Sequence, residues 1–333
     1  MTNVQGKLLR GRTAEGGGSG AVLGAAAGEV LAAGQDRVYG FLTQLNVITA
    51  YHLLRNGTVD PNRLGDEFAA LAFPERGSDV YRAASPWFRA WLEEYRRGSP
   101  SPLPFGNAGA AARMVSIGVW FRKDPVALVE EAIRAAMITH NQAGSVVAAC
   151  AVAGAVAGAA FGQSGRDLVF GTAEVAKQAE ARLAGVPGIS ASPAGSPPLS
   201  LLFRHAGQLV GAPTREISDQ IQSWTPNAAA VGGVVTAIVL GAPILERPSV
   251  GVRDAVGVDS ESREVAVMAG AVVGARVGPH RWPWQVVNDL WFAELGRRLA
   301  NGDGRYEDLP DPYAVEEVLT FAGRPTEAPG SQS

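Results

Sequence analysis

Apolar residues recur at helical spacing along most of the chain. The clearest stretches are 41–54, 127–138, 286–299 and 313–321. A further helix is expected after Thr214, where Ile217 and Ile221 lie four residues apart. Residues three or four apart share one face of an α-helix, so this spacing predicts amphipathic helices. No stretch of alternating apolar and polar residues ends in a hairpin turn, so the pattern predicts an all-α fold.

Capping residues followed by proline mark where several helices should begin. Three such pairs are Asp60-Pro61, Ser85-Pro86 and Asp124-Pro125. An Asp or Ser side chain at this position accepts a hydrogen bond from the first turn, and proline is favoured as the first helical residue. Gly57 follows the first apolar stretch and suits the left-handed conformation that ends many helices.

Segments without helical pattern suggest how the chain is divided. Residues 1–18 are polar and Gly-rich, and residues 323–333 are rich in Gly, Pro and Ser, so both are expected to be flexible tails. We expect residues 19–322 to form a single helical domain. The Gly-, Pro- and Ser-rich segment 185–199 is interpreted as a surface loop, with a linker between two domains as the alternative.

Three apolar runs could be mistaken for membrane or export signals. The run 21–31 is interrupted by Glu29 and preceded by three glycines, which argues against a signal peptide. The runs 144–161 and 226–245 approach membrane-spanning length. Both consist mainly of Ala, Gly and Val, so we expect them to pack inside a helical protein and expect no membrane partner.

Composition and charge narrow the class of protein. Of 333 residues, 47% are hydrophobic and 18% are charged, which excludes disorder over most of the chain. The net charge is −3 and no basic stripe is present, so no nucleic-acid partner is expected. Cys150 is the single cysteine, which excludes an internal disulfide framework and a Cys-rich zinc site and favours a cytoplasmic location.

A glycine-rich turn precedes a helix-like run in the first half of the chain. It consists of Gly106, Asn107, Ala108 and Gly109, and Arg113 follows one helical turn later. Backbone N–H groups at such a helix start favour a phosphate group. A plain connecting turn is the alternative.

Two further polar segments interrupt apolar helices. His140, preceded by Thr139, is a candidate ligand contact or, alternatively, a helix-capping or packing residue. Residues 257–262 read GVDSES, which places two carboxylates and two hydroxyls ahead of an uncharged helix. Such oxygens are the ligands that Mg²⁺ and Mn²⁺ prefer. The alternative is a helix N-cap whose acidic residues complement the helix dipole.

Taken in order, these segments resemble motifs of the ADP-ribosylglycohydrolase family over about residues 20–290. The run SGAVLGAAAGEVLAAG is similar to the family's opening helix, and GNAGAAARMVSIG to its Gly-Asn-Gly-x-x-x-Arg segment. Thr139 and His140 match its Thr-His pair. GVDSES and the small-residue helix after it match the family's Gly-Gly-Asp-Thr-Asp-Thr segment.

The resemblance implies an orthogonal bundle of helices around a cleft that holds two Mg²⁺ ions. In the family, a Thr-Asp-Asp motif near the N-terminus and an Asp-x-Asp-Thr motif near the C-terminus hold these ions. By resemblance, the C-terminal metal positions are Asp259, Glu261 and Ser262. An ADP-ribose-like or nucleoside-like small molecule would lie along Gly106, Asn107, Ala108, Gly109 and His140.

The N-terminal metal motif is missing from this chain. Residues 40–43 read Gly-Phe-Leu-Thr where the family has Thr-Asp-Asp-Thr. Phe and Leu side chains cannot ligate a hard cation. At the C-terminal motif Glu261 replaces an aspartate and Ser262 replaces a threonine, so oxygen ligands remain. We therefore expect at most one Mg²⁺ ion.

Two functions compete on this basis. The first is a divergent glycohydrolase that cleaves an N- or O-ribosidic bond of an ADP-ribose-like ligand, which could be a small molecule rather than a modified protein. Its candidate catalytic carboxylates are Asp259, Glu261 and Glu29, which would orient water and stabilise charge. The second is a non-catalytic relative that binds or regulates. A plain helical interaction protein leaves the polar motifs unexplained, and the sequence does not indicate an oligomeric state.

Overall fold

The described part of the protein is built from helices. The computed structural model describes residues 14–34, 38–73, 79–98, 102, 106–244, 248–258, 262–279 and 282–321. Within these ranges no β-strand is present, and one isolated β-bridge joins Gln142 to Ser190. The all-α prediction is therefore confirmed.

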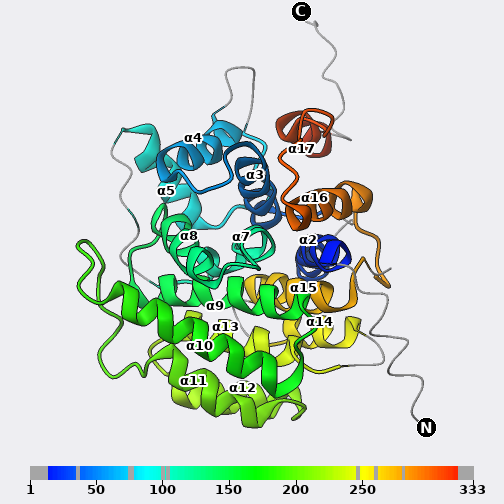
Figure 1. Ribbon diagram of the computed structural model, residues 1–333. Helices are drawn as coiled ribbons and strands as arrows, with labels where there is room; N and C mark the ends of the chain where they lie inside the picture. Colours follow the sequence, from blue (N-terminus) through cyan, green and yellow to red (C-terminus); the bar gives the residue numbers. More distant parts are fainter. Residues whose placement is uncertain are drawn as a thin grey trace, which may run out of the picture.

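The helices follow one another closely along the chain (Figure 1). In chain order they are α2 Ala14–Ala33, α3 Phe41–Asn56, α4 Pro61–Ala72, α5 Pro86–Arg96, α6 Gly109–Ala112, α7 Val115–Trp120, α8 Pro125–Met137, α9 Ala143–Ala160, α10 Gly165–Leu183, α11 Leu199–Ala206, the 3₁₀ helix η1 Gly207–Leu209, α12 Thr214–Trp224, α13 Ala229–Gly241, α14 Ser249–Val256, α15 Ser262–Val277, α16 Asp289–Asn301 and α17 Pro312–Phe321. Most of the apolar stretches predicted as helices lie within these bounds, although α16 begins at Asp289 rather than at residue 286.

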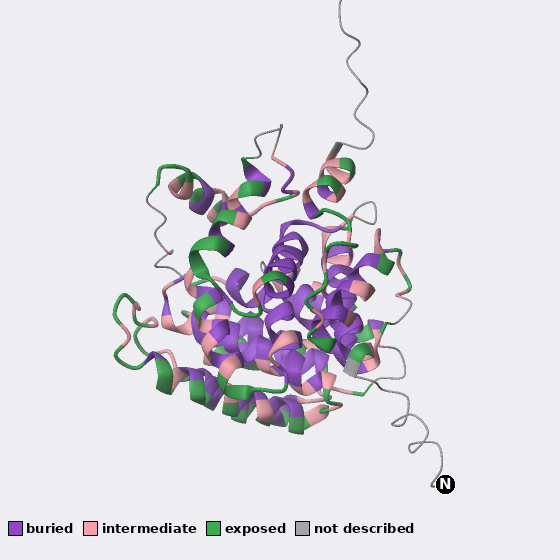
Figure 2. Cartoon of the chain, turned by 45° about the horizontal axis from the view of Figure 1, so that its top comes forward, coloured by how far each residue is buried: buried purple, intermediate pink, exposed green. Residues whose placement is uncertain are grey.

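Helices α2, α9 and α15 lie at the centre of the molecule and are largely buried (Figure 2). All three consist mainly of Ala, Gly and Val. Helix α9 is long and apolar enough to cross a membrane, but 78% of it is buried inside the protein. Small side chains let helices approach closely, so in this structure the apolar runs form core helices.

Glycines at the contact between α2 and α15 allow the two backbones to touch. A Cβ atom on Gly24 would lie 2.1 Å from the carbonyl oxygen of Gly270. A Cβ atom on Gly18 would lie 2.3 Å from the carbonyl oxygen of Gly296 in α16. This second contact explains why α2 begins at Ala14, inside the segment that the sequence predicted as a tail ending at residue 18.

The predicted helix starts differ in how they are capped. The Asp60 side chain accepts hydrogen bonds from the backbone N–H groups of Asn62 and Arg63. The Asp124 side chain accepts the equivalent hydrogen bonds from Val126 and Ala127. Ser85 holds the N-cap position of α5, but its side chain makes no capping hydrogen bond. The predicted loop 185–199 connects α10 to α11 and ends where α11 begins at Leu199.

Candidate functional site

The glycine-rich turn and His140 are in direct contact. Asn107 Oδ1 lies 2.7 Å from the backbone N of Gly109 and 2.8 Å from His140 Nε2. Ser145, in the first turn of α9, adds a 3.3 Å hydrogen bond from its hydroxyl to the Asn107 carbonyl. The turn and the histidine are separated by about thirty residues in sequence and are held together by one amide side chain.

A directional chain of hydrogen bonds fixes the state of His140. Asn107 Oδ1 can only accept, so His140 Nε2 carries the proton that it donates. In the neutral ring Nδ1 then accepts from the Thr139 hydroxyl, 2.8 Å away. Arg113 Nη2 donates to Thr139 Oγ1 across 2.7 Å. The order Arg113, Thr139, His140, Asn107 therefore selects the Nε2–H tautomer.

Burial keeps the histidine neutral. Burial, assisted by the neighbouring Arg113 charge, lowers the pKa of His140 to about 3. Burial also lowers the pKa of Arg113 to about 9. The Arg113 guanidinium is bound by the carbonyl oxygens of Ala135 and Ala136 at the C-terminal end of α8, where a cation is favoured by the helix dipole.

One face of the glycine-rich turn is closed. The N–H of Gly109 is already bound by Asn107 Oδ1, and a Cβ atom on Gly109 would lie 2.2 Å from Cζ2 of Trp87. The sequence predicted that this turn presents free N–H groups to a phosphate, and for Gly109 that prediction is wrong. The other end of the turn is open, because Gly106 lines a pocket beside Gln142.

The start of α3 carries the residues that replace the family's N-terminal metal motif. Its backbone N–H groups at Leu42 and Thr43 donate to the two carboxylate oxygens of Glu29, at 3.2 and 2.8 Å. Glu29 is fully buried. The shortened loop between α2 and α3 thus brings Glu29 over the helix start, where a carboxylate satisfies free N–H groups and complements the helix dipole.

Aromatic side chains fill the space between α3 and the glycine-rich turn. The buried Phe41 ring lies 6.0 Å from the Trp87 ring and 5.5 Å from the Phe88 ring, between ring centres. Trp87 in turn lies 4.9 Å from the His140 ring. A continuous chain of ring contacts therefore runs from Phe41 through Trp87 to His140. It fills the space between the start of α3 and the Thr139–His140 pair.

The acidic segment lies partly outside the described residues. Asp259 and Glu261 are not described, and for Ser262, the first residue of α15, only the backbone is. Arg263, the next residue, donates to the Ala83 carbonyl and lines a cavity of about 200 Å³ together with Glu29 and Gly40. The start of α15 is therefore next to the start of α3. The resemblance implies one cleft for the glycine-rich turn, His140 and the acidic segment; Asn107 and His140 do meet, and the position of the acidic segment stays a prediction.

The described residues do not fit the N-terminal half of a two-metal centre. They contain no group of three or more His, Cys, Asp or Glu side chains placed to hold a metal ion. Phe41 and Leu42 are fully buried hydrocarbon side chains. Thr43 Oγ1 is buried without a hydrogen-bond partner, and one neutral hydroxyl cannot replace two carboxylates around a divalent ion.

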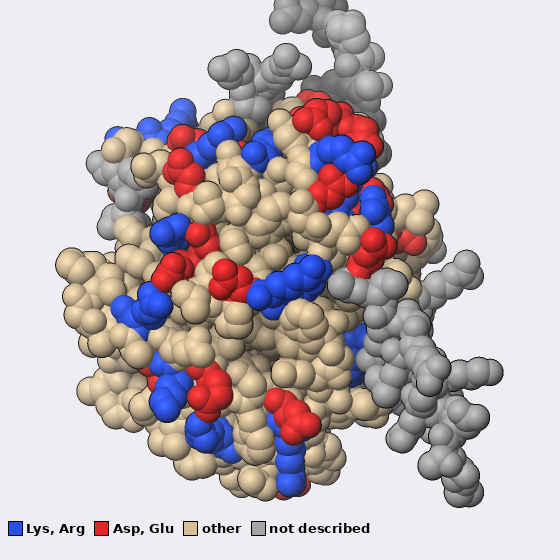
Figure 3. Space-filling model, in the orientation of Figure 1, with Lys and Arg blue, Asp and Glu red and all other residues tan. Residues whose placement is uncertain are grey.

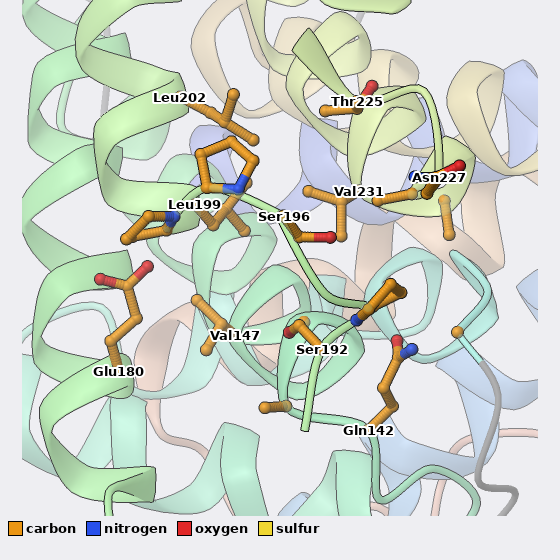
Figure 4. A pocket seen from close by; sticks show the side chains of 18 of the residues that line it. Gln142, Val147, Glu180, Ser192, Ser196, Leu199, Leu202, Thr225, Asn227 and Val231 are labelled. Carbon is orange, nitrogen blue, oxygen red and sulfur yellow. The ribbon is translucent and has the colours of Figure 1, made fainter. Parts of the chain in front are cut away.

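A pocket of about 960 Å³ opens beside the Gly106 end of the turn (Figure 4). Its walls are the first turns of α9, α11 and α13, the last turn of α10 and the segments 192–198 and 225–228. Backbone hydrogen bonds from Ala143 to Ser190 and from Ser190 to Asn141 fasten the 185–199 loop next to Gln142. This pocket was not predicted from the sequence; the length of the loop and its Gly-, Pro- and Ser-rich composition are the features that could have indicated it.

Comparison with known proteins relates the chain to one family. The family model for ADP-ribosylglycohydrolase matches residues 18–308. The chain belongs to the ADP-ribosylglycohydrolase family. A solved "ADP-ribosylglycohydrolase-related protein complex" superposes with a TM-score of 0.62 at 21% sequence identity, covering 87% of this chain and 99% of that chain. No curated protein sequence matches the chain.

Membership of the ADP-ribosylglycohydrolase family shows the fold and suggests the general activity. The match in structure confirms the predicted helical bundle of this fold. Family membership suggests a glycohydrolase that acts on ADP-ribose-like substrates. The described residues retain the glycine-rich turn and the Thr139–His140 pair and lack the N-terminal metal ligands, so ligand binding and catalysis have to be considered separately.

Charged side chains of both signs are mixed on the surface. On the face in Figure 3, Lys and Arg alternate with Asp and Glu, and no basic stripe crosses it. Several arginines are paired, as Arg182 is with Glu130 at 2.5 Å and Arg297 with Glu294 at 2.7 Å. This face offers no continuous basic surface to a polyanion.

Proposed function

We propose that this member of the ADP-ribosylglycohydrolase family binds an ADP-ribose-like or nucleoside-like small molecule and lacks the family's two-metal hydrolytic centre. The start of α3 carries the proposal. Hydrocarbon side chains occupy the positions of the two aspartates, and the Glu29 carboxylate beside them accepts two backbone hydrogen bonds.

The binding half of the proposal rests on the network around His140. The ring is neutral and held in one tautomer by partners on both nitrogens. Hydrogen bonds on both ring nitrogens hold the imidazole in one orientation, while Asn107 Nδ2 and Arg113 Nε and Nη1 remain buried without a partner. The adjoining pocket of about 960 Å³ lies within the range of volumes that bind small molecules, roughly 300–1,000 Å³.

The metal half of the proposal is that one Mg²⁺ ion at most is bound, at Asp259 and Glu261. A pair of Mg²⁺ ions carries four positive charges, and the protein must supply anionic oxygens on both sides to offset them and the loss of hydration. On the α3 side the chain supplies Thr43 and a carboxylate already engaged with the helix start. A single ion could keep most of its water shell and use few protein ligands.

The test is a comparison of binding with turnover on the full chain. Calorimetry measures the affinity for ADP-ribose and adenosine, and chromatography measures hydrolysis of ADP-ribosylated and nucleoside substrates with and without Mg²⁺. We expect saturable binding of at least one ligand and no Mg²⁺-dependent turnover.

Three outcomes separate the alternatives. Turnover that needs Mg²⁺ and is lost in Asp259→Ala would contradict the proposal and favour a divergent glycohydrolase. Turnover that is independent of Mg²⁺ and lost in Glu261→Gln would favour a hydrolase that uses carboxylates alone. Absence of both binding and turnover would contradict the binding half of the proposal.

A further inference from the structure

The pocket beside the glycine-rich turn has two unlike walls. One wall presents the amides of Gln142 and Asn227 and the Ser192 hydroxyl, with Val231 beside Asn227 (Figure 4). The opposite wall presents Val147, Leu199 and Leu202, with Glu180 at its edge. A ligand that fits both walls has an apolar face and a hydrogen-bonding edge.

Gln142 directs a hydrogen-bonding group into this pocket. Its side chain is about nine-tenths buried, and its Oε1 receives one long contact of 3.4 Å from the Ser145 hydroxyl. Its Nε2 has no hydrogen-bond partner among the described residues, and the side chain lines the pocket. The Nε2 atom is not among the fully buried atoms that lack a partner, so it is open to the pocket, where a ligand acceptor can take the place of water.

The charge of the pocket restricts its ligand. Glu180 is the one charged residue among the described residues that line it. The Glu180 carboxylate is engaged, because it accepts hydrogen bonds from the backbone N and the hydroxyl of Ser200 at 3.0 and 2.6 Å. No Lys, Arg or His side chain among the described lining residues could pair with a diphosphate.

Helix starts supply only part of the charge that a diphosphate needs. Helices α9 and α13 begin at the pocket without side-chain caps. A helix start carries roughly half an elementary charge. One N–H of the first turn of α9, at Ala143, is already bound by the Ser190 carbonyl. Two phosphate charges beside a carboxylate would therefore remain poorly compensated.

We propose that this pocket takes an uncharged nucleoside, and that the protein's ligand is a nucleoside rather than ADP-ribose itself. This inference rests on the proposed binding function and selects between its two ligand classes. The heterocycle would lie against the wall formed by Val147, Leu199 and Leu202. Gln142 Nε2 would donate to an acceptor on the base or the ribose, and the Ser192 hydroxyl and the Asn227 amide would bind the remaining ribose oxygens.

The experiment is calorimetric titration of the full-length protein with adenosine, AMP and ADP-ribose at 50 and 500 mM salt. We expect adenosine to bind about tenfold or more tightly than ADP-ribose, since each phosphate adds an unpaired charge. The adenosine affinity should be unchanged by salt, because no ion pair is involved.

Two variants in the pocket and one control variant outside it test where the ligand binds. Ser196→Phe places a ring in the pocket from the loop side and should abolish adenosine binding, whereas Ser223→Phe, at an exposed position on α12 outside the pocket, should not. Gln142→Leu keeps the size of the side chain and removes its donor, which should weaken binding about 2- to 12-fold. Thermal unfolding of each variant shows whether the protein remains folded.

The outcomes distinguish this inference from the proposed function. ADP-ribose binding as tightly as adenosine, or adenosine binding that survives Ser196→Phe in a folded protein, would overturn the inference and leave the binding function standing. Failure of every ligand to bind the folded wild-type protein would overturn both.

Discussion

The start of α3 and the glycine-rich turn both contact Trp87, through Phe41 and Gly109. The two regions differ in how many polar residues of the family's motifs they keep. At the turn, Asn107 and His140 keep polar groups that are bound to one another. At α3, Phe41 presents hydrocarbon where the family has a carboxylate, and Glu29 occupies the helix start from another element. One half of the site thus keeps its polar network, while the other half is packed as hydrophobic core.

Restoring an aspartate at the start of α3 should destabilise the protein. Phe41→Asp would bury a carboxylate among aromatic rings and near Glu29, and an uncompensated buried charge lowers the free energy of unfolding by about 3–5 kcal/mol. Urea unfolding measures the change. Phe41→Leu, which keeps the site apolar, should lose only roughly 1–2 kcal/mol. A stable Phe41→Asp variant that gains Mg²⁺ binding would mean that the metal site needs only this one residue.

Glu29 should be a structural residue of α3. Glu29→Ala removes both acceptors from the helix start, and we expect a loss of about 2–4 kcal/mol in the free energy of unfolding. Glu29→Gln keeps one carbonyl acceptor and should lose less. Glu93→Ala, at an exposed position of α5, serves as the control and should change stability by less than about 0.5 kcal/mol. Equal stability of the Glu29→Ala and wild-type proteins would contradict a structural role for Glu29.

The network at the glycine-rich turn should make stability depend on pH. The folded pKa of His140 is about 3, and in the unfolded chain it is about 6.5. Between these values the unfolded chain binds a proton that the folded protein does not, so stability is complete above about pH 6.5 and falls as the pH falls. From pH 7.5 to 5 the His140 contribution should fall by about 2 kcal/mol.

This pH dependence is isolated by comparing wild type with His140→Gln in urea unfolding at pH 7.5, 6 and 5. All other titratable groups contribute equally to the pH dependence of both proteins, so the difference between the two stabilities reports on His140. Parallel stability curves for the two proteins would show that His140 is able to take up a proton in the folded state.

Much of the fold could be predicted because its signals are local. The caps at Asp60 and Asp124 depend on residues within one helical turn, as does the end of α3 at Gly57. The start of α2 was predicted too late, because its first glycines have the composition of a flexible tail and form helix only through contact with a partner. That partner, the backbone at Gly296, is distant in sequence.

The candidate site was less predictable because its contacts are long-range. Asn107 and His140 were both singled out, but the hydrogen bond between them follows from the packing of α6 against α9. The role of Trp87 as a cover for Gly109 has no local signal. Likewise, Glu29 was a candidate catalytic carboxylate on sequence alone, whereas its contact with the start of α3 depends on how α2 and α3 pack together.

The proposed absence of a two-metal centre is tested by Mn²⁺ and Mg²⁺ calorimetry on the wild-type protein. We expect at most one weak site, and loss of that site in Asp259→Ala. Two tight sites in the wild-type protein would contradict it, because Phe41, Leu42 and the engaged Glu29 carboxylate leave the α3 side without the charge that a second ion requires.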